Sequence, residues 1–339
     1  MIKKPIVISM GEPSGIGTEI LVKSWIERKK KKINPFFVVD NFLRFKSMIN
    51  YLKLKATVRE IKNPSETANV FEDHIPVYNI GKKISFKLGS PDKENSKYII
   101  ESIRRSFNFV KENKASSLIT LPVCKKTLKE YGFKFKGQTE YVGYLSKKYI
   151  KNSSNEIMIL TTSKPVDSGK NLIIGLLTTH IPLKNVLNDL TKKKLSEKIM
   201  IFYNSLKSIW KIRKPIIGVL ALNPHAGEEG TIGKEEEKII LPVIKKLKKK
   251  NVSLQGPLSS DSCFFKNNRK KYDGIFCLYH DQGLSPLKTL DFFNSVNVTG
   301  GLPILRVSPD HGPAFDIAKK KEAKIDSLIS CFEFLKKYS

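Results

Sequence analysis

Three of the five histidines in the chain occupy the same kind of position in the sequence. Each follows an apolar run that predicts a buried strand: His180 after "IIGLLTT", His225 after "GVLALNP" and His280 after "GIFCLY". Because the carboxyl ends of parallel strands meet at one edge of a sheet, we expect these imidazoles to converge although they are far apart in the sequence. Three neutral imidazoles and an open position are typical of a catalytic zinc or a similar divalent metal ion.

A single histidine at a strand end is more often structural, so the pattern alone leaves both interpretations open. Asp281 and Glu228 stand beside two of these histidines and are candidates for orienting the ring N–H groups. His74 lies in a polar loop, which favours a structural role, whereas His311, in a turn, is a candidate for a supporting role near the site.

Cationic and polar residues follow the third histidine. Lys288, Asn297 and Arg306 occur in "LSPLK", "NSVNVTGG" and "GLPILR", and we expect Arg306 to end another apolar run. A lysine and an arginine beyond sheet ends suit a substrate with phosphate and carboxylate groups. The glycine-rich segment "MGEPSGIGTE" (10–19) predicts either an anion-binding backbone nest or a tight strand-to-helix turn. Glu12 in this turn suggests a cation opposite.

The overall composition, with 40% hydrophobic and 27% charged residues, is that of a soluble globular protein, and we infer a cytoplasmic one with no membrane partner. The net charge of +29 is mostly lysine in short runs, which favours a solvated surface over a nucleic-acid partner. The four cysteines are scattered, which argues against a disulfide framework or a cysteine-built zinc site.

Short apolar runs alternate with longer amphipathic segments along the chain. This alternation predicts an α/β fold in two lobes, with a mainly parallel sheet and helices on both faces. The expected strands are 5–10, 36–40, 117–121, 171–180, 215–225 and 273–280; the expected helices are 17–30, 96–113, 191–210 and 234–251.

A series of motifs then resembles one known family over nearly the whole chain. The motifs are "ISMGEPSGIGTE", "FKGQTEYV", "LLTTHIPL", "LNPHAGEEG", "LQGPLSSDSCF", "LYHDQGLSPLK", "VNVTGGLPILR" and "DHGPAFDIA". They are similar to those of 4-hydroxythreonine-4-phosphate dehydrogenase, an enzyme of pyridoxal 5'-phosphate (vitamin B6) biosynthesis. The segments with "NPHAGE" and "YHDQG" are the most specific.

The resemblance implies a fold and an assembly. It implies two α/β/α lobes around a cleft, similar to isocitrate and isopropylmalate dehydrogenases, and a homodimer with active sites at the subunit interface. The expected first lobe comprises 1–125 and about 289–312. The expected second lobe, with the histidines and dimer contacts, comprises 126–288 and about 313–339.

The resemblance also implies the roles of individual residues. His180, His225 and His280 match ligands of one divalent cation, zinc, magnesium or cobalt, which the family shares between subunits. The matching substrate-binding residues are Gln138, Thr139, Lys288, Asn297 and Arg306. Lys288, Asp261 and Asp281 are the candidate catalytic residues. The coenzyme is NAD or NADP, for which no binding residue is assigned.

The implied reaction is oxidation of 4-phosphooxy-L-threonine to 2-amino-3-oxo-4-phosphooxybutanoate, which loses CO2 to give 3-amino-2-oxopropyl phosphate. Two alternatives are a dehydrogenase of 4-phospho-D-threonate or 4-phospho-D-erythronate and a metal-dependent hydrolase. Substrate choice is the open point because Gln138 replaces the usual family histidine, and glutamine cannot carry charge or a proton. Further departures from the family are Leu121, Cys124, Gly300 and Pro313.

Overall fold

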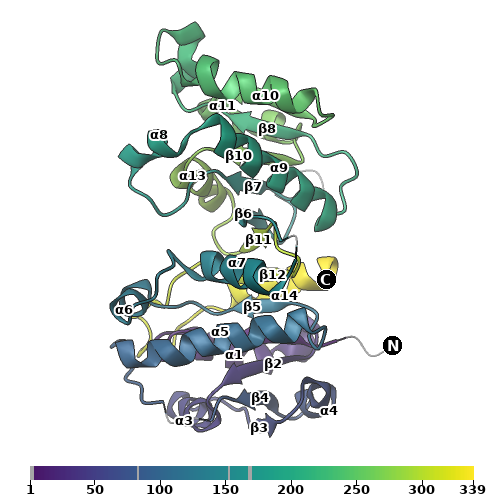
Figure 1. Ribbon diagram of the computed structural model, residues 1–339. Helices are drawn as coiled ribbons and strands as arrows, with labels where there is room; N and C mark the ends of the chain where they lie inside the picture. Colours follow the sequence, from purple (N-terminus) through teal and green to yellow (C-terminus); the bar gives the residue numbers. More distant parts are fainter. Residues whose placement is uncertain (1–3, 82–83, 152, 167–169) are drawn as a thin grey trace. The chain divides into compact units, whose positions relative to one another are not determined.

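The computed structural model describes residues 4–81, 84–151, 153–166 and 170–339 (Figure 1). Residues 1–3, which belong to the expected first lobe, lie outside this set. The chain divides into two compact units. Unit 1 comprises 1–151 and 303–339, and unit 2 comprises 152–302.

Unit 1 contains a parallel sheet of the order β3-β4-β2-β1-β5-β12. Its strands are β1 (Ile6–Ser9), β2 (Phe36–Asp40), β3 (Val58–Ile61), β4 (Ile75–Asn79), β5 (Leu118–Thr120) and β12 (Arg306–Pro309). Its helices are α1 (Gly17–Ile26), α2 (Arg28–Lys31), α3 (Phe42–Leu52), α4 (Thr67–Phe71), α5 (Ser96–Lys111), α6 (Lys125–Glu130), α7 (Gln138–Tyr149) and α14 (Asp326–Tyr338), with short 3-10 turns η1 (Pro64–Glu66) and η2 (Lys93–Asn95).

Unit 2 contains a mixed sheet of the order β11-β6-β7-β10-β8-β9. Its strands are β6 (Ile157–Thr162), β7 (Ile173–Leu176), β8 (Ile217–Leu220), β9 (Leu254–Leu258), β10 (Gly274–Cys277) and β11 (Ser295–Gly300). The helical elements are η3 (Leu183–Asn185), α8 (Val186–Asp189), α9 (Lys192–Ser208), η4 (Pro224–Gly230), the π-helical turn η5 (Glu236–Ile240), α10 (Leu241–Lys248), α11 (Ser260–Cys263), α12 (Lys266–Arg269) and α13 (His280–Leu290).

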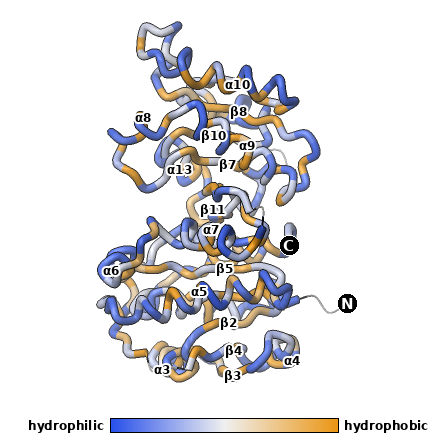
Figure 2. Tube along the Cα trace, in the orientation of Figure 1, coloured by the Kyte–Doolittle hydropathy of each residue, from blue (hydrophilic) through white to orange (hydrophobic). Residues whose placement is uncertain are grey.

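Many of the strands in both units are largely hydrophobic (Figure 2). Every residue of β1 and β2 is buried. Strands buried on both faces have continuous apolar runs instead of alternating ones, as parallel strands covered by helices require. Helix α5 instead alternates polar and apolar residues, and it packs one face against β1 and β2.

Two glycines allow helix α9 to approach the sheet of unit 2 closely. A Cβ atom on Gly175 in β7 would lie 2.8 Å from the ring of Phe202, and one on Gly274 in β10 would lie 2.7 Å from it. The Phe202 ring therefore occupies the space that larger side chains at these two positions would fill. This close contact packs α9 against β7 and β10, the strands that precede His180 and His280.

The expected α/β class with a mostly parallel sheet is confirmed. The antiparallel exceptions are the pairs β11–β6 and β6–β7. Two expected helices are interrupted: the helix 17–30 divides into α1 and α2 at Glu27, and the segment 234–251 begins with a π-helical turn.

The expected lobe boundaries differ from the observed division. Residues 126–151 and 313–339 belong to unit 1, because α7 packs against α5, and α14 packs against α1 and β12. Residues 289–302 belong to unit 2, because β11 pairs with β6 along its whole length.

The described part of the chain has no helix that is both long and apolar enough to cross a bilayer.

Candidate functional site

The three histidine-bearing segments follow neighbouring parallel strands of unit 2. Strand β10 lies between β7 and β8 and is parallel to both. His180 follows β7, His225 follows β8 and His280 follows β10. The strands end a few residues before the histidines, so each histidine lies in the loop or helix beyond its strand. The expectation that the three carboxyl ends meet at one sheet edge is therefore confirmed by the topology.

His180 and His280 lie side by side at this edge. Their ring centroids are 5.4 Å apart, and the ring planes are inclined at 46°. Two imidazoles on one tetrahedral metal, with metal–nitrogen bonds of about 2 Å, place their centroids roughly 5 Å apart. The separation of these two rings thus suits a shared cation.

Asp281 orients the imidazole of His280. Nδ1 of His280 lies 2.6 Å from Oδ1 of Asp281, and His280 is the first residue of α13. With the proton on Nδ1 donated to this carboxylate, the lone pair of Nε2 is left to bind a cation. The expected role of Asp281 beside the ring is consistent with this contact.

His225 lies in a turn of unusual backbone conformation. The turn η4 has left-handed φ angles at six successive residues, from His225 to Gly230, with values between 40° at Glu228 and 89° at Gly230. Nδ1 of His225 is 3.9 Å from Oε1 of Glu228, which is an ion-pair distance rather than a hydrogen bond. Over the described ranges of the chain, no three His, Cys, Asp or Glu side chains are grouped closely enough to hold one metal ion. The structure therefore pairs two of the three histidines and leaves His225 apart from them.

The carboxylate of Glu236 supports the start of this turn. Its Oε1 accepts hydrogen bonds from the backbone N–H groups of Leu222 (2.8 Å) and Asn223 (2.9 Å), and its Oε2 accepts one from the Asn223 side chain (2.8 Å). Glu236 is buried, at 4% exposure. No role was predicted for Glu236 from the sequence, in which it is a carboxylate in the first turn of the expected helix 234–251.

The other candidates of unit 2 differ in their surroundings. Asp261 is exposed, and a hydrogen bond of 2.6 Å from the Ser259 hydroxyl lowers the pKa of its carboxyl group. Lys288, in the last turn of α13, donates a hydrogen bond to Oγ of Ser295 (2.8 Å). Asn297 lies in β11, and its Oδ1 is buried with no hydrogen-bond partner among the described residues. A buried carbonyl oxygen of this kind is available to a ligand.

Arg306, Thr139 and Gln138 belong to unit 1. Contrary to expectation, Arg306 begins strand β12 instead of ending an apolar run, and it is buried at 2% exposure. Its Nη1 donates a hydrogen bond to Oγ1 of Thr139 (3.2 Å), and its Nη2 contacts Oγ1 of Thr120. Burial lowers the pKa of the guanidinium to about 10, so Arg306 remains a cation at neutral pH. Its position is thus fixed by two threonine hydroxyls.

Gln138 has a structural contact in addition to any role at the substrate. Its Nε2 donates a hydrogen bond of 3.0 Å to the carbonyl of Leu121, just beyond β5. Its Oε1 is buried and has no hydrogen-bond partner in the described structure. The amide therefore ties the first turn of α7 to the end of β5 and leaves one acceptor available.

The glycine-rich loop after β1 packs tightly against other backbone. A Cβ atom on Gly11 would lie 2.6 Å from the carbonyl oxygen of Pro122, and one on Gly15 would lie 2.8 Å from Pro313. The backbone N–H of Ile16 also donates to the carbonyl of Pro313 (3.0 Å). Close packing alone thus explains the glycines, in agreement with the tight-turn interpretation.

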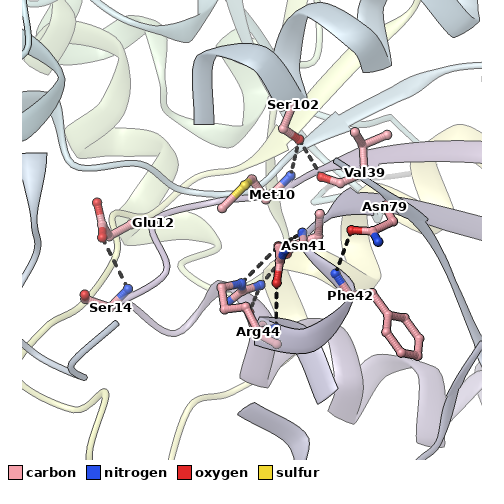
Figure 3. A network of polar contacts seen from close by, with 11 residues as sticks. Met10, Glu12, Ser14, Val39, Asn41, Phe42, Arg44, Asn79 and Ser102 are labelled. Carbon is pink, nitrogen blue, oxygen red and sulfur yellow. Dashed lines mark hydrogen bonds and ion pairs between the residues drawn. The ribbon is translucent and has the colours of Figure 1, made fainter. Parts of the chain in front are cut away.

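Glu12 in this loop is buried at 1% exposure (Figure 3). Its Oε1 accepts a hydrogen bond from the backbone of Ser14 (3.2 Å), and Oε2 has no hydrogen-bond partner among the described residues. Burial raises the pKa of Glu12 to about 7, against the opposing effect of the Arg44 charge. The cation expected opposite Glu12 is not in contact with it among the described residues: the charge of Arg44 acts on the Glu12 pKa, but the ion-pair partner of Arg44 is the buried Asp40.

The two remaining histidines make local contacts. Nδ1 of His74 lies 2.8 Å from Oγ1 of Thr57, and Nδ1 of His311 lies 2.9 Å from the carbonyl of Gly312. The contact of His74 is consistent with the structural role expected of it.

Comparisons with known proteins give a consistent result. A family model described as pyridoxal phosphate biosynthetic protein PdxA matches residues 31–335. A 4-hydroxythreonine-4-phosphate dehydrogenase of Zymomonas mobilis subsp. mobilis is 37% identical over 96% of this chain and 93% of its own length. The enzyme of the same name from Caulobacter vibrioides is 36% identical, over 99% and 98%.

Solved structures agree with the sequence relatives. A 4-hydroxythreonine-4-phosphate dehydrogenase from Klebsiella pneumoniae superposes with a TM-score of 0.83 at 30% identity, over 98% of this chain and 99% of that one. One from Burkholderia phymatum gives a TM-score of 0.79 at 28% identity, over 98% of both chains.

The topology and the full-length similarity define an α/β oxidoreductase. The chain belongs to the family of pyridoxal phosphate biosynthetic protein PdxA. The resemblance drawn from the motifs is thus confirmed, and the hydrolase alternative finds no support among the relatives.

Proposed function

We propose that the chain oxidises 4-phosphooxy-L-threonine with NAD or NADP to 2-amino-3-oxo-4-phosphooxybutanoate, which then decarboxylates to 3-amino-2-oxopropyl phosphate. The observation that carries the proposal is the set of three histidines beyond adjacent parallel strands, in a chain whose full-length relatives are named 4-hydroxythreonine-4-phosphate dehydrogenase. The reaction would supply a step of pyridoxal phosphate biosynthesis, the role that the family description states.

The donor set fits a divalent cation in type and in spacing. His180 and His280 are 5.4 Å apart between ring centroids, and Asp281 leaves Nε2 of His280 free to bind. When bound, the nicotinamide would accept a hydride and the cation would polarise the hydroxyl group that is oxidised. Zinc, magnesium and cobalt all remain candidates, because imidazole ligands accept several metals.

The cationic residues have distinct proposed roles toward the substrate. Arg306 would bind an anionic group as a guanidinium oriented by Thr139, because a fixed planar fork suits phosphate or carboxylate oxygens. Lys288 would supply a second cation, and Asn297 would accept a hydrogen bond at its available Oδ1. Each of these contacts would restrict the orientation of the group that it binds.

The site is proposed to be completed by a second copy of the chain. His180 and His280 are paired within one chain, whereas His225 is apart from them. A homodimer that shares ligands between subunits would bring the third imidazole from the partner. Two-fold assemblies of this kind are the commonest soluble oligomers.

The test is to replace His225 or His280 with alanine. The proposal predicts that each variant loses both bound divalent metal and NAD(P)-dependent turnover, while its circular dichroism spectrum remains that of the wild type. Metal content is measured by elemental analysis and turnover by absorbance of the reduced nicotinamide. Survival of both properties in either variant would contradict the metal role.

A second candidate keeps the same chemistry and changes the substrate to 4-phospho-D-threonate or 4-phospho-D-erythronate. The observation that favours it is Gln138, which stands where the resemblance leads us to expect histidine and which uses its amide N–H toward Leu121. A neutral residue there alters the recognition of charged substrate groups. Values of kcat/KM measured side by side on the amino and hydroxy substrates decide between the two.

A further inference from the structure

Gln282 is a buried side chain that makes three hydrogen bonds at the histidine-bearing edge of unit 2. Its Oε1 accepts from the backbone N–H of Leu278 (2.8 Å). Its Nε2 donates to the carbonyl of Ala221 (2.7 Å) and to the hydroxyl of Ser260 (2.8 Å). The residue is 7% exposed, so these contacts are shielded from water.

The three partners belong to three different segments of the candidate site. Leu278 lies between the end of β10 and His280, Ala221 lies between the end of β8 and His225, and Ser260 directly precedes Asp261. The Gln282 side chain therefore sets the spacing between three segments. These segments carry His280, His225 and the candidate catalytic residue Asp261. Its own place in the first turn of α13 links all three to that helix.

The chemistry of these contacts requires an amide. The Leu278 N–H needs an acceptor, and the Ala221 carbonyl needs a donor. Glutamine supplies both, whereas a carboxylate offers only acceptors and an apolar side chain offers neither. Both Leu278 backbone groups are met by side chains, since Oγ1 of Thr178, which follows β7, donates to the Leu278 carbonyl (2.8 Å). The ends of β7, β10 and β8 are thus joined in sequence across the sheet edge.

We propose that Gln282 is a positioning residue that fixes the His280 and His225 segments so that each presents its imidazole to a divalent cation: His280 in the site of its own subunit, and His225 in the site that it completes on a second copy of the chain. It acts through the backbone of these segments. The proposal rests on the proposed function, because the cation that it serves is the one assigned there. When a residue that orients a metal ligand without contacting the metal is replaced, the metal affinity typically changes by 10- to 100-fold.

The experiment compares Gln282→Glu and Gln282→Met with the wild type. Gln282→Glu retains an acceptor for Leu278 and sets a carboxylate against the Ala221 carbonyl, whereas Gln282→Met keeps the size and removes all three hydrogen bonds. The matched control is Asn95→Asp in unit 1, where another buried amide donates to a carbonyl, that of Ser85 (2.9 Å). Ser260→Ala is a milder variant that removes one of the three bonds.

Two readouts are used. The first is binding of Co²⁺ alone, by titration and by the visible spectrum of the bound ion. Both Gln282 variants are expected to bind Co²⁺ at least about tenfold more weakly than the control, with an altered spectrum, and Ser260→Ala about threefold more weakly. The second is backbone hydrogen exchange without metal, expected to accelerate in 221–226 and 278–282.

The outcomes separate this proposal from the proposed function. Co²⁺ affinity, spectrum and exchange equal to those of the Asn95→Asp control would overturn the positioning role, whatever the wild type catalyses. Weaker Co²⁺ binding and faster exchange in the two segments of the Gln282 variants, with a wild type that binds Co²⁺ but does not reduce NAD(P), would support the positioning role and overturn the proposed function.

Discussion

At the scale of single residues, the candidate site depends on how each charged or polar side chain is held. Asp281 contacts one nitrogen of His280, and Thr139 contacts one nitrogen of Arg306. In both cases a contact with a short neighbouring side chain fixes the orientation of a group that would bind a ligand. A hydrogen bond to a buried charged group such as Arg306 contributes about 1.5 to 3 kcal/mol, whereas solvent screens the contact of the exposed Asp281, which contributes about 1 kcal/mol or less.

The contact between Thr139 and Arg306 gives the first prediction. Thr139→Val removes the hydroxyl and leaves the guanidinium less well oriented, so KM for the phosphorylated substrate is expected to rise about tenfold. The measurement is steady-state kinetics with saturating coenzyme. Thr127→Val is the control, since it removes a buried hydroxyl that donates to the Cys124 carbonyl (3.1 Å) in α6. Equal KM values for the two variants would contradict the role of Thr139.

Glu12 gives a prediction on pH dependence. Its pKa is about 7 in the folded chain and 4.5 in its ordinary state, so the folded state holds this proton over a pH range in which the unfolded state has lost it. Stability from Glu12 is therefore present below pH 4.5 and lost as the pH rises to about 7. Glu12→Gln is expected to stabilise the fold by roughly 2 to 3 kcal/mol at pH 8.

The measurement is denaturant unfolding of both proteins at several pH values. The gain from Glu12→Gln should be small at pH values below the ordinary pKa and should grow until the folded-state pKa is passed. Glu130→Gln, an exposed carboxylate in α6, serves as the control. A gain that does not change with pH would show that Glu12 has the same pKa in the folded and unfolded states.

The individual residues were predictable to different degrees. The histidines stood out because an imidazole after an apolar run is rare in a chain with five of them. Burial of Arg306 at the start of β12 was not predictable, because the preceding "GGLPIL" resembles a strand in its own right. Gln282 was also missed, since its three partners come from segments up to 61 positions away.

At the scale of elements, the turn that carries His225 is the most unusual feature. Four of its left-handed residues are not glycine: His225, Ala226, Glu228 and Glu229. Each such residue costs roughly 1 to 2 kcal/mol, so the turn persists only because neighbouring groups stabilise it. The carboxylate of Glu236 at the start of η5 is one of these groups.

Removing that carboxylate gives an element-scale prediction. Glu236→Ala leaves the backbone N–H groups of Leu222 and Asn223 without their acceptor, and the free energy of unfolding is expected to fall by roughly 2 to 4 kcal/mol. The measurement is chemical denaturation. Glu237→Ala, an exposed neighbour on the same helical segment, should change stability by less than about 0.5 kcal/mol. Equal effects of the two substitutions would rule out the support assigned to Glu236.

The elements themselves were largely predictable, and their ends were not. The strand Phe36–Asp40 matches its expected bounds, because a short run of large apolar residues is bounded by polar ones on one side and proline on the other. The strands before the histidines end earlier than expected. Gly283 lies inside α13 and not in a loop, and a Cβ atom at this position would come 2.8 Å from Ile174 of the neighbouring strand β7.

At the scale of the whole molecule, the order of strands could not be deduced from the alternation of elements. The alternation predicted a mostly parallel sheet, but the adjacency of β7, β10 and β8 depends on which strands pair over long separations. The boundary between the units was also misplaced, since α7 and α14 are assigned by the surfaces against which they pack.

The proposed sharing of ligands between two copies gives a whole-molecule prediction. His180→Ala and His225→Ala are each expected to be inactive alone. When the two variants are unfolded, mixed and refolded together, mixed dimers would contain one intact site, and activity should recover to roughly a quarter of the wild type. The dimeric mass is checked by light scattering. If verified mixed dimers recover no activity, His180 and His225 of the same subunit act in one site, and the proposed sharing between subunits is wrong.

The most direct test of the central claim is a comparison of substrates with the purified, metal-loaded protein. The rate of nicotinamide reduction is measured with 4-phosphooxy-L-threonine, 4-phospho-D-threonate and 4-phospho-D-erythronate, each with NAD and with NADP. We expect reduction with 4-phosphooxy-L-threonine at the highest kcat/KM, accompanied by release of CO2. If the coenzyme is reduced only with 4-phospho-D-threonate or 4-phospho-D-erythronate, that hydroxy acid is the substrate in place of 4-phosphooxy-L-threonine. If neither coenzyme is reduced with any of the three compounds, the proposed function is contradicted.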